Sequence, residues 1–463
     1  MIPKRIIPTS ATAVVVVLLA LPLSSCGLYS NYSSTTEEDN NIKELYNYIE
    51  ATDDTTNIAN ISWREFFTDS HLQALISKGL ENNSDLSVAQ INVEQAEIAL
   101  TKARLAYIPS VNASVSGGAS SFNGSNSQTY EAALTASWEI DLFGKLRNAK
   151  RQSKAALEQS RAYRQAVQTQ LIATIANSYY SLLMLDEQLK ISEQTQVNWD
   201  ENIRVMQAMK RAGRVNEAAV LQSQASSAAL QSQIITLREQ IAELENTLST
   251  LLSMPTEHIE RGVITDIQIP DNLSFGVPMQ LLTNRPDVRM AESYLEQMFY
   301  ATSEARGSLY PSITLSGTIG YTNSYGVTVN PAQMLYNAAA QVLQPIFNQG
   351  TLRAQLKISK LQQQQALIQF NQTVIEAGAE VNNALSSWQA AQARLYYTSE
   401  QVELLQRAVT NTELLMKHGS STYLEVLTAQ LTLLTAELSY ASDIYNQAQG
   451  VVNLYRALGG GEE

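Results

Sequence analysis

The sequence contains few cysteine, histidine and proline residues, and each shortage narrows the possible classes of protein. A single cysteine, Cys26, among 463 residues means that no disulfide can form within the chain, and it excludes a cysteine-rich zinc site. The three histidines lie far apart, and no pair of them has the spacing of metal ligands on a helix. Only 11 prolines interrupt the chain, which favours long regular elements.

Basic residues are also scarce. Lys and Arg together number 31 against 44 Asp and Glu, which gives a formal net charge of −13. A surface of this sign repels phosphate backbones, so we expect no binding to nucleic acid. The sequence offers no nucleophile–base pair, phosphate-binding loop or metal cluster. We therefore predict a protein that is not an enzyme, with no catalytic residue, no metal site and no dissociable cofactor.

Long hydrophobic runs are missing, since no stretch reaches 18 apolar residues. Two basic residues precede a short apolar segment at 11–23, which is typical of an export signal. Residues 23–27 resemble a bacterial lipobox, in which the thiol of Cys26 takes a diacylglycerol group and its amino group an acyl chain after cleavage. The alternative is an ordinary signal peptide with an incidental cysteine. Gly27 is not the aspartate that retains lipoproteins at the inner membrane, so we expect an anchor in the outer membrane of a Gram-negative bacterium.

An internal repeat organises the rest of the chain. Residues 85–110 match residues 287–312 at an offset of 202, and residues 140–252 match residues 346–458 at an offset of 206. Two unrelated segments would not keep register over this length, so the chain contains two copies of one unit. The predicted domains are a removed signal peptide (1–25), a lipidated extended or equatorial segment (26–69), a first repeat (70–277) and a second repeat (278–463).

Each repeat has the same predicted order of elements. A helix comes first, and a hairpin of two strands with period-two alternation follows, within 110–143 and 312–346. We expect a Gly/Ser/Asn-rich loop at 117–128. One long helical hairpin ends each repeat, at 146–252 in the first and at 352–458 in the second. The first arm of each hairpin has 67 residues and would be about 100 Å long.

Two strand pairs supply four membrane strands per chain, which are too few to close a barrel with a lumen. Open edges in lipid leave backbone amide groups unpaired, each at a cost of several kcal/mol. We therefore predict a mixed α and β membrane protein that completes its sheet with other copies of itself, while the long helices continue the pore. The sequence alone does not separate three copies from two or four. A cytosolic coiled coil, the alternative for the long helices, leaves the lipobox and the strand pairs unexplained.

Several segments carry a resemblance to the TolC-like outer membrane efflux family, and in particular to the NodT-type lipoproteins of resistance–nodulation–division efflux systems. These segments are Trp63–Asp69, Asn83–Leu86, Ser137–Lys145, Arg285–Glu292, Gln344–Gly350 and Leu454–Gly460. The resemblance implies a homotrimer with a twelve-stranded β-barrel, a twelve-helix periplasmic barrel and an equatorial region. Arg285 and Asp287 are expected to cap and brace the equatorial helix; the alternative is contact with substrate.

The function implied by this resemblance is that of the exit duct of a tripartite efflux pump. Such a duct passively conducts drugs, toxic small molecules or ions that it receives from a periplasmic adaptor and an inner-membrane resistance–nodulation–division transporter. The alternative within transport is the duct of a type I polypeptide secretion system. A periplasmic adaptor lipoprotein is a further alternative, but it needs no membrane strands.

The resemblance also implies a periplasmic gate. In the family an acidic residue lies six positions after the hairpin glycine of the second copy, which is Glu425 here, six after Gly419. Some members of the family have a second acidic residue nine positions after this glycine, but this chain has Thr428 there. The position of the first copy that matches Glu425 is Ala219, so we expect a single acidic ring. The alternative is that Glu425 is an ordinary solvated helix residue.

Two other groups of residues receive predicted roles. Tyr130 and Trp138 are expected in the aromatic girdle at the membrane interface, or else in packing at the base of the barrel. Methionines 206, 209 and 416 are interpreted as packing residues rather than metal ligands. The hairpin tips are expected to dock the adaptor, although their charges could equally complement the helix dipoles. The tip residues are Lys210, Arg211, Gly213, Arg214, Lys417, His418 and Gly419.

Overall fold

The computed structural model describes residues 31–33, 61–122, 124–267, 285–323 and 333–461. The predictions for the signal peptide and for Cys26 lie outside these residues. The chain divides into two compact units, and each is described by itself. The first combines Met1–Glu38, Val93–Ser160 and Met290–Asn371, and the second combines Asp39–Asn92, Arg161–Arg289 and Gln372–Glu463. Each unit thus takes segments from both sequence repeats.

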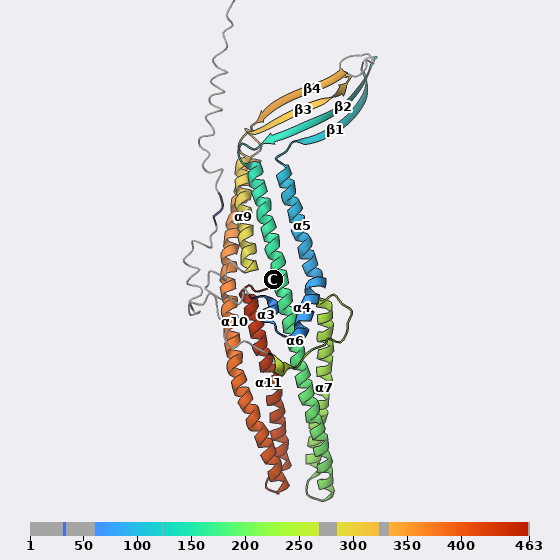
Figure 1. Cartoon of the computed structure of the whole chain (residues 1–463), viewed down its shortest axis with the longest axis vertical. Coiled ribbons are helices and arrows are strands. Elements are labelled where there is room, and N and C mark those ends of the chain that lie inside the picture. The colour runs from blue at the N-terminus through green and yellow to red at the C-terminus, as the bar shows by residue number, and fades with distance from the viewer. Residues whose placement is uncertain (1–30, 34–60, 123, 268–284, 324–332, 462–463) are drawn as a thin grey trace, which may run out of the picture. The chain divides into compact units, whose positions relative to one another are not determined.

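The first unit contains one antiparallel sheet in the order β1-β2-β3-β4 (Figure 1). The strands are β1 (Ser110–Phe122), β2 (Ser125–Ile140), β3 (Ser312–Thr322) and β4 (Gln333–Leu343). The central pairing of β2 with β3 joins the hairpin of the first repeat to that of the second. Within the described chain, β1 and β4 are therefore the two edges of the sheet.

The strand register gives the sheet one apolar and one polar face. Side chains alternate between faces along a strand, so residues paired across the sheet share a face. One row across the four strands is apolar and consists of Ala113, Leu134, Ile319 and Tyr336. The next row is polar and consists of Asn112, Thr135, Thr318 and Asn337. Leu134 and Ile319 are each 50% exposed, so the described residues of the chain leave this apolar face largely uncovered.

The expected loop at 117–128 is wrong. Pairing between β1 and β2 continues without a break from Ser110↔Ser137 to Phe122↔Ser125. Gly124, with a φ of +82°, lies in the tight turn between the strands. Glycine and serine are weak strand formers, but the pairing of their backbone amides with a neighbouring strand overrides that local preference.

The helices reproduce the internal repeat residue for residue. α5 (Ser84–Leu105) and α9 (Pro286–Gly307) begin and end 202 positions apart, since 286 − 84 and 307 − 105 both equal 202. The other two helix pairs keep the offset of 206, because 351 − 145 and 423 − 217 both equal 206. They are α6 (Lys145–Arg211) with α10 (Thr351–Lys417), and α7 (Glu217–Leu251) with α11 (Tyr423–Ala457). The predicted two-fold repeat is therefore confirmed.

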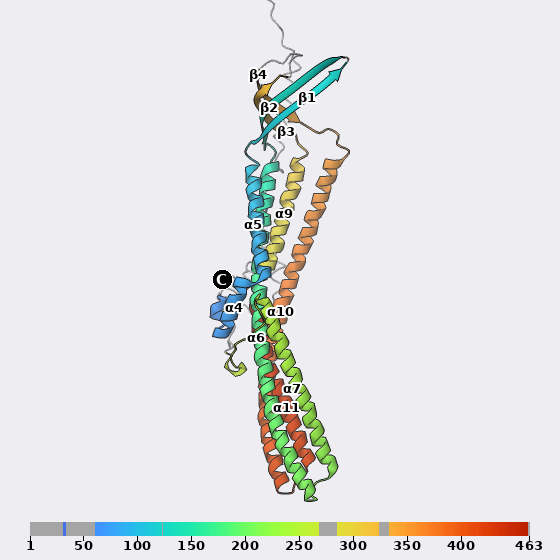
Figure 2. The ribbon, with the colours of Figure 1, turned by 90° about the vertical axis from the view of Figure 1, so that its right-hand side faces the viewer.

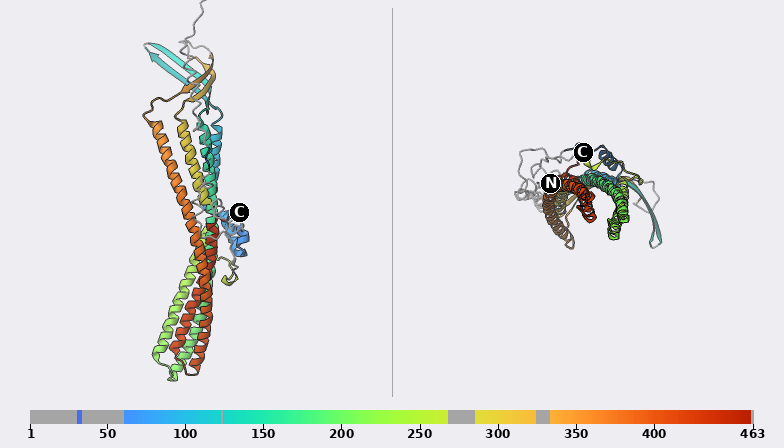
Figure 3. Two further views of the ribbon diagram at one scale, coloured as in Figure 1. Left: turned by 90° about the vertical axis from the view of Figure 1, so that its left-hand side faces the viewer. Right: turned by 90° about the horizontal axis from the view of Figure 1, so that it is seen from below.

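In the second unit the long helices form two hairpins. α7 returns beside α6 and α11 beside α10 (Figure 2), and the two hairpins lie side by side (Figure 3). Trp199 of α6, Leu230 and Ile234 of α7 and Leu434 of α11 form a buried cluster between them. This cluster fixes the hairpins against each other above their turns.

The main core of the second unit lies where short elements cover α6 and the end of α11. α3 (Trp63–Phe66) and α4 (Ser70–Asn82) belong to it, with the short helix η3 (Ile264–Asp266). The rings of Phe66 and Tyr455 stack at 4.2 Å, and Tyr179 is fully buried. None of the helices in the described ranges has the length and apolarity that crossing a bilayer requires.

The two faces of the sheet predict opposite responses to an inserted charge. Leu134 lies on the apolar face, four residues from both Tyr130 and Trp138, whereas Thr135 lies on the polar face. Leu134→Lys should destabilise the inserted sheet by about 2–4 kcal/mol, the cost of a lysine facing the middle of a bilayer. The fraction of chain recovered as heat-modifiable, membrane-inserted barrel measures this effect.

The matched control is Thr135→Lys, which places the same charge one residue away on the face expected to meet water. It should insert nearly as well as the unchanged chain. Equal losses from both substitutions would show that the faces are assigned wrongly.

Candidate gate and hairpin turns

The two hairpin turns have the same backbone geometry. Gly213 and Gly419 have φ values of +69° and +77°, the left-handed region that favours glycine. The amide after each glycine closes the turn, from Arg214 to the carbonyl of Met209 and from Ser420 to that of Leu415, both at 2.9 Å. This is the Schellman pattern that ends a helix.

Glu425 lies at the third position of α11 and caps that helix. Its carboxylate accepts a hydrogen bond from the backbone N–H of Thr422 at 2.9 Å and another from the hydroxyl of Ser421. These two hydrogen bonds, that from Ser421 first, hold the pKa of Glu425 below its ordinary value. The side chain is exposed and remains negatively charged at neutral pH.

The first repeat caps the matching helix differently. The side chain of Asn216 accepts the N–H of Ala219 at 2.9 Å, so α7 begins with a neutral cap where α11 has a carboxylate. Thr428, the second acidic position in the family, donates its hydroxyl to the carbonyl of Leu424 at 2.8 Å. At these matched positions only the second repeat carries a carboxylate.

The basic residues of the tips are exposed but not equivalent. Lys210 forms an ion pair with Glu217 across the first turn, whereas Arg211 and Arg214 are exposed beside it. Lys417 and His418 are exposed at the end of α10, where positive charge also complements the helix dipole. The geometry is compatible with docking and with dipole compensation, so docking stays a prediction.

Neutral amide side chains link the two hairpins above the tips, and no sequence pattern predicted these contacts. Gln188 of α6 donates to the carbonyl of Leu438 at 3.2 Å and to the hydroxyl of Ser442 at 2.9 Å, both on α11. Asn202 donates to the side chain of Gln430 at 3.4 Å. Glutamines are so frequent on these helices that the sequence does not single out Gln188 or Gln430 as residues that link the hairpins.

Of the three methionines, Met206 is only 1% exposed, as the packing interpretation predicts, whereas Met209 and Met416 are half-buried. The described residues contain no group of three or more His, Cys, Asp or Glu side chains suited to a metal ion.

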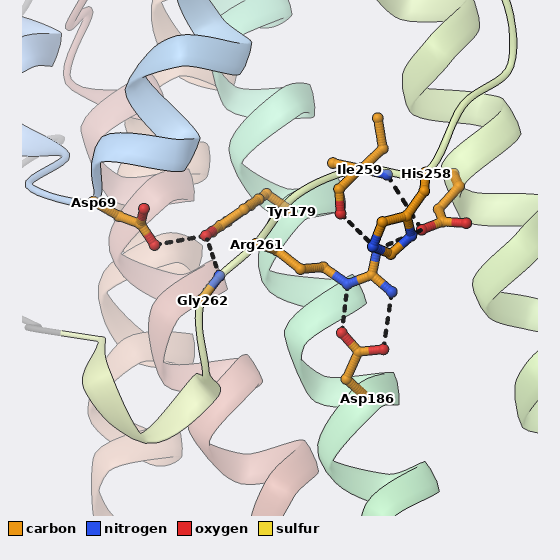
Figure 4. A network of polar contacts seen from close by, with 8 residues as sticks. Asp69, Tyr179, Asp186, His258, Ile259, Arg261 and Gly262 are labelled. Carbon is orange, nitrogen blue, oxygen red and sulfur yellow. Dashed lines mark hydrogen bonds and ion pairs between the residues drawn. The ribbon is translucent and has the colours of Figure 1, made fainter.

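An arginine network fixes the segment after α7, and it was also missed (Figure 4). Arg261 reaches both oxygens of Asp186 on α6 and also pairs with Glu245 on α7. These hydrogen bonds outweigh burial and raise the pKa of Arg261, because they favour its charged form. His258 contacts Glu245 as well, at 2.9 Å.

The hydroxyl of Tyr179 forms the second half of this network. It donates to Asp69 at 2.6 Å and accepts the backbone N–H of Gly262 at 3.1 Å (Figure 4). Burial is the main reason that the pKa of Tyr179 is raised, with the hydrogen bond to Asp69 next. One side chain of α6 thus holds two segments that are distant in sequence.

The bracing role expected for Arg285 and Asp287 is confirmed. Arg285, 5% exposed, donates to both oxygens of Asp287 at 3.0 and 2.6 Å, to Glu380 and to the carbonyl of Ala457. Arg456 pairs with the other oxygen of Glu380. The cluster is electrically balanced and ties the start of α9 to α10 and α11.

Tyr130 and Trp138 share the apolar face of β2. They lie eight positions apart, about 26 Å along the strand at 3.3 Å per residue, or about 20 Å along the membrane normal at the usual strand tilt, against an apolar band about 25 Å tall. Both are partly exposed, and the indole N–H of Trp138 donates to the carbonyl of Tyr107 at 2.9 Å. Their interfacial role stays a prediction, and this spacing is compatible with it.

A four-stranded sheet with one apolar face, joined in one chain to two long helical hairpins, defines the class of outer membrane channels that close by association of copies. The family model for outer membrane efflux proteins matches residues 75–253 and 277–460, one match in each repeat. The chain belongs to this family.

Individual proteins agree with the family match. The probable outer membrane lipoprotein SilC of Salmonella typhimurium is 30% identical over 414 residues, which cover 86% of this chain and 88% of SilC. The pyoverdine export outer membrane protein OpmQ of Pseudomonas aeruginosa is 29% identical over 416 residues, covering 86% and 87%. A crystal structure of CusC has a TM-score of 0.80 and 27% identity, covering 87% of this chain and 95% of that one.

The chain is therefore an outer membrane channel of an efflux system and has the trimeric fold of these channels. The predictions of family, fold class, function and location in the outer membrane are confirmed. The family consists of channel proteins rather than enzymes.

The Tyr179 network predicts a stability difference between adjacent residues. Tyr179→Phe removes the two hydrogen bonds of this buried hydroxyl, to half-buried Asp69 and to the exposed N–H of Gly262, and should cost about 0.5–1.5 kcal/mol. Tyr180→Phe is the control, since the hydroxyl of Tyr180 makes no hydrogen bond to the described residues. The thermal midpoint of the detergent-solubilised protein should fall clearly for Tyr179→Phe alone, and equal midpoints would contradict the assigned role.

Proposed function

We propose that this channel is the exit duct of a tripartite pump and receives its cargo from an inner-membrane resistance–nodulation–division transporter through a periplasmic adaptor. The observation that carries the proposal is the doubled unit of strand pair and long helical hairpin in a chain of the outer membrane efflux family. Relatives are named for the efflux of cations (CusC), for the export of pyoverdine (OpmQ) and as an antibiotic efflux pump protein (ArpC). These names favour drugs, toxic small molecules or ions as cargo over polypeptides.

The proposed closure of the trimer is supported by two apolar flanks of the chain. On α5, which precedes β1, Ile98 and Leu105 are 71% and 56% exposed and seven residues apart. On α10, which follows β4, Leu361 and Ile368 are 54% and 69% exposed with the same spacing. A seven-residue spacing suits packing between two helices. We infer that β1 and α5 of one copy join β4 and α10 of the next, with Tyr130 and Trp138 at the membrane interfaces.

Glu425 is proposed to form the gate. Three copies around one axis would place three carboxylates near each other, a ring that attracts cations and repels anions. The hydrogen bonds from Ser421 and Thr422 support this role because they keep the carboxylate charged and hold it in one position.

Two substitutions separate the charge of Glu425 from its capping role. Glutamine at this position can still accept the N–H of Thr422, whereas alanine removes both the charge and the cap. We expect Glu425→Gln and Glu425→Ala to weaken block by multivalent cations to a similar degree in planar-bilayer recordings. Block of Glu425→Gln at the concentration that blocks the unchanged channel would remove the gate proposal and leave a capping residue.

The exposed tips are proposed to dock the adaptor. Lys210 is neutralised by Glu217, so Arg211 and Arg214 provide the available positive charge of the first turn. Lys417 provides that of the second turn, with exposed His418 beside it, and the glycines keep both turns tight.

Reversing charge at one tip tests docking without altering the pore. The double variant Arg211→Glu/Arg214→Glu should lower toxin tolerance toward that of a deletion strain, with single-channel conductance unchanged. Arg204→Glu, a change at an exposed α6 residue away from the turn, is the control and should keep tolerance. Full tolerance in the double variant would contradict docking through these residues.

Cys26 is proposed to carry the lipid anchor, with a diacylglycerol group on sulfur and an acyl chain on nitrogen. The relative SilC is named a probable outer membrane lipoprotein, which supports the assignment.

Metabolic labelling tests the anchor directly. Radiolabelled palmitate should enter the unchanged chain and be absent from Cys26→Ser. Label retained on the variant would place the lipid elsewhere.

A further inference from the structure

The described segment at residues 31–33 contacts the first unit through Tyr32. Its ring meets the ring of Phe299 on α9 edge to face, with centroids 5.8 Å apart and an interplanar angle of 64°. Its backbone N–H also points to the hydroxyl of Tyr300 at 3.5 Å. Tyr32 is half-buried while its neighbours Asn31 and Ser33 are exposed, so the contact belongs to one side chain of the segment.

The surface that receives Tyr32 is well ordered by its own contacts. Phe299 and Tyr300 meet edge to face at 5.3 Å, and Tyr300 is 6% exposed. The guanidinium of Arg151 on α6 lies over the ring of Tyr300 at 5.5 Å. Edge-to-face aromatic pairs have a defined geometry, so this cluster can hold a third ring in one position.

We propose that Phe299 and Tyr300 form a docking site for Tyr32 and thereby fix the amino-terminal lipid anchor to the channel. This inference rests on the proposed acylation of Cys26. Tyr32 lies six positions after Cys26, and a span of six positions reaches at most about 20 Å. Phe299 lies eight residues before the end of α9 at Gly307, or about 12 Å along the helix. From this site the acyl chains can reach the level at which the sheet begins.

Docking also shortens the effective tether. Trp63, the first residue of α3, lies 37 positions after Cys26. A flexible chain of that length has a root-mean-square span of about 33 Å, against about 13 Å for six residues. A docked Tyr32 therefore confines the anchor to a much smaller volume beside the channel.

Photocrosslinking in cells tests the docking site. With p-benzoylphenylalanine in place of Tyr32, we expect a crosslink within one chain, mapped by mass spectrometry to the peptide that contains Phe299 and Tyr300. The same group in place of the exposed Asn31 is the matched control and should give much less of this product. Crosslinks from position 32 that map only to another segment, or to another copy, would overturn the proposal.

A second measurement gives the strength of docking. Loss of one aromatic pair should raise the undocked fraction of the segment roughly twofold to tenfold. Tyr32→Ala should therefore increase the rate of proteolysis within residues 26–60 by that factor, and Asn31→Ala should not. Equal rates for the two variants would contradict a role for the ring.

The Cys26→Ser chain separates this proposal from that of the anchor. If Tyr32 docks by its own contacts, the crosslink persists in Cys26→Ser although palmitate label is lost. A crosslink in a chain that never takes label would support docking and overturn only the acylation. Label without the crosslink would overturn docking and leave the acylation standing.

Discussion

Backbone hydrogen bonding in lipid is the constraint on which the rest of this molecule depends. The chain supplies a sheet of four strands whose edges are β1 and β4. Unpaired amide groups cost several kcal/mol each in hydrocarbon, where water cannot replace the missing partner. One chain therefore cannot be stable in the membrane, and association of copies is a condition of folding rather than a later refinement. The apolar face that contains Leu134 and Ile319 contacts lipid only in that assembled state.

The internal repeat lets one chain supply four adjoining strands of the barrel. Each repeat brings one strand pair and one helical hairpin, and the pairing of β2 with β3 joins the two copies into a continuous sheet. The repeats have diverged where symmetry between them is not required. The matched helices α7 and α11 are capped at different positions. Asn216 is the N-cap of α7, whereas the capping carboxylate of α11 belongs to Glu425, where α7 has Ala219. A structural role and a proposed functional role thus coincide in one side chain.

The polar networks of the second unit hold elements together where helix packing alone would not specify them. Residues 252–267, the described part of the segment after α7, have no regular structure apart from η3, and Arg261 and Tyr179 attach them to α6 and to α4. Arg285 and Glu380 do the same for the start of α9. Because removal of one partner would leave a buried charge or hydroxyl unpaired, these residues specify one arrangement rather than merely adding stability.

Much of this fold could be predicted from local pattern. Comparison of the chain with itself gave the offsets of 202 and 206 and so located the repeat. The period-two strands and the turn glycines at 213 and 419 are properties of neighbouring residues, and they located the strand pairs and the long helices. The loop expected at 117–128 failed because strand pairing with a distant partner outweighed the weak propensity of glycine and serine. Family resemblance, rather than spacing, singled out Glu425 and the tip residues.

The sequence by itself determined the order of the elements, their lengths and their duplication, because helix and strand periods are written in adjacent residues. Only the tertiary structure decided which side chains meet across the chain. Arg261 lies 75 positions from Asp186, Gln188 lies 254 from Ser442, and the N–H of Tyr32 lies 268 from the hydroxyl of Tyr300. No local pattern records such contacts, since they depend on how the long helices and the segments between them pack in three dimensions.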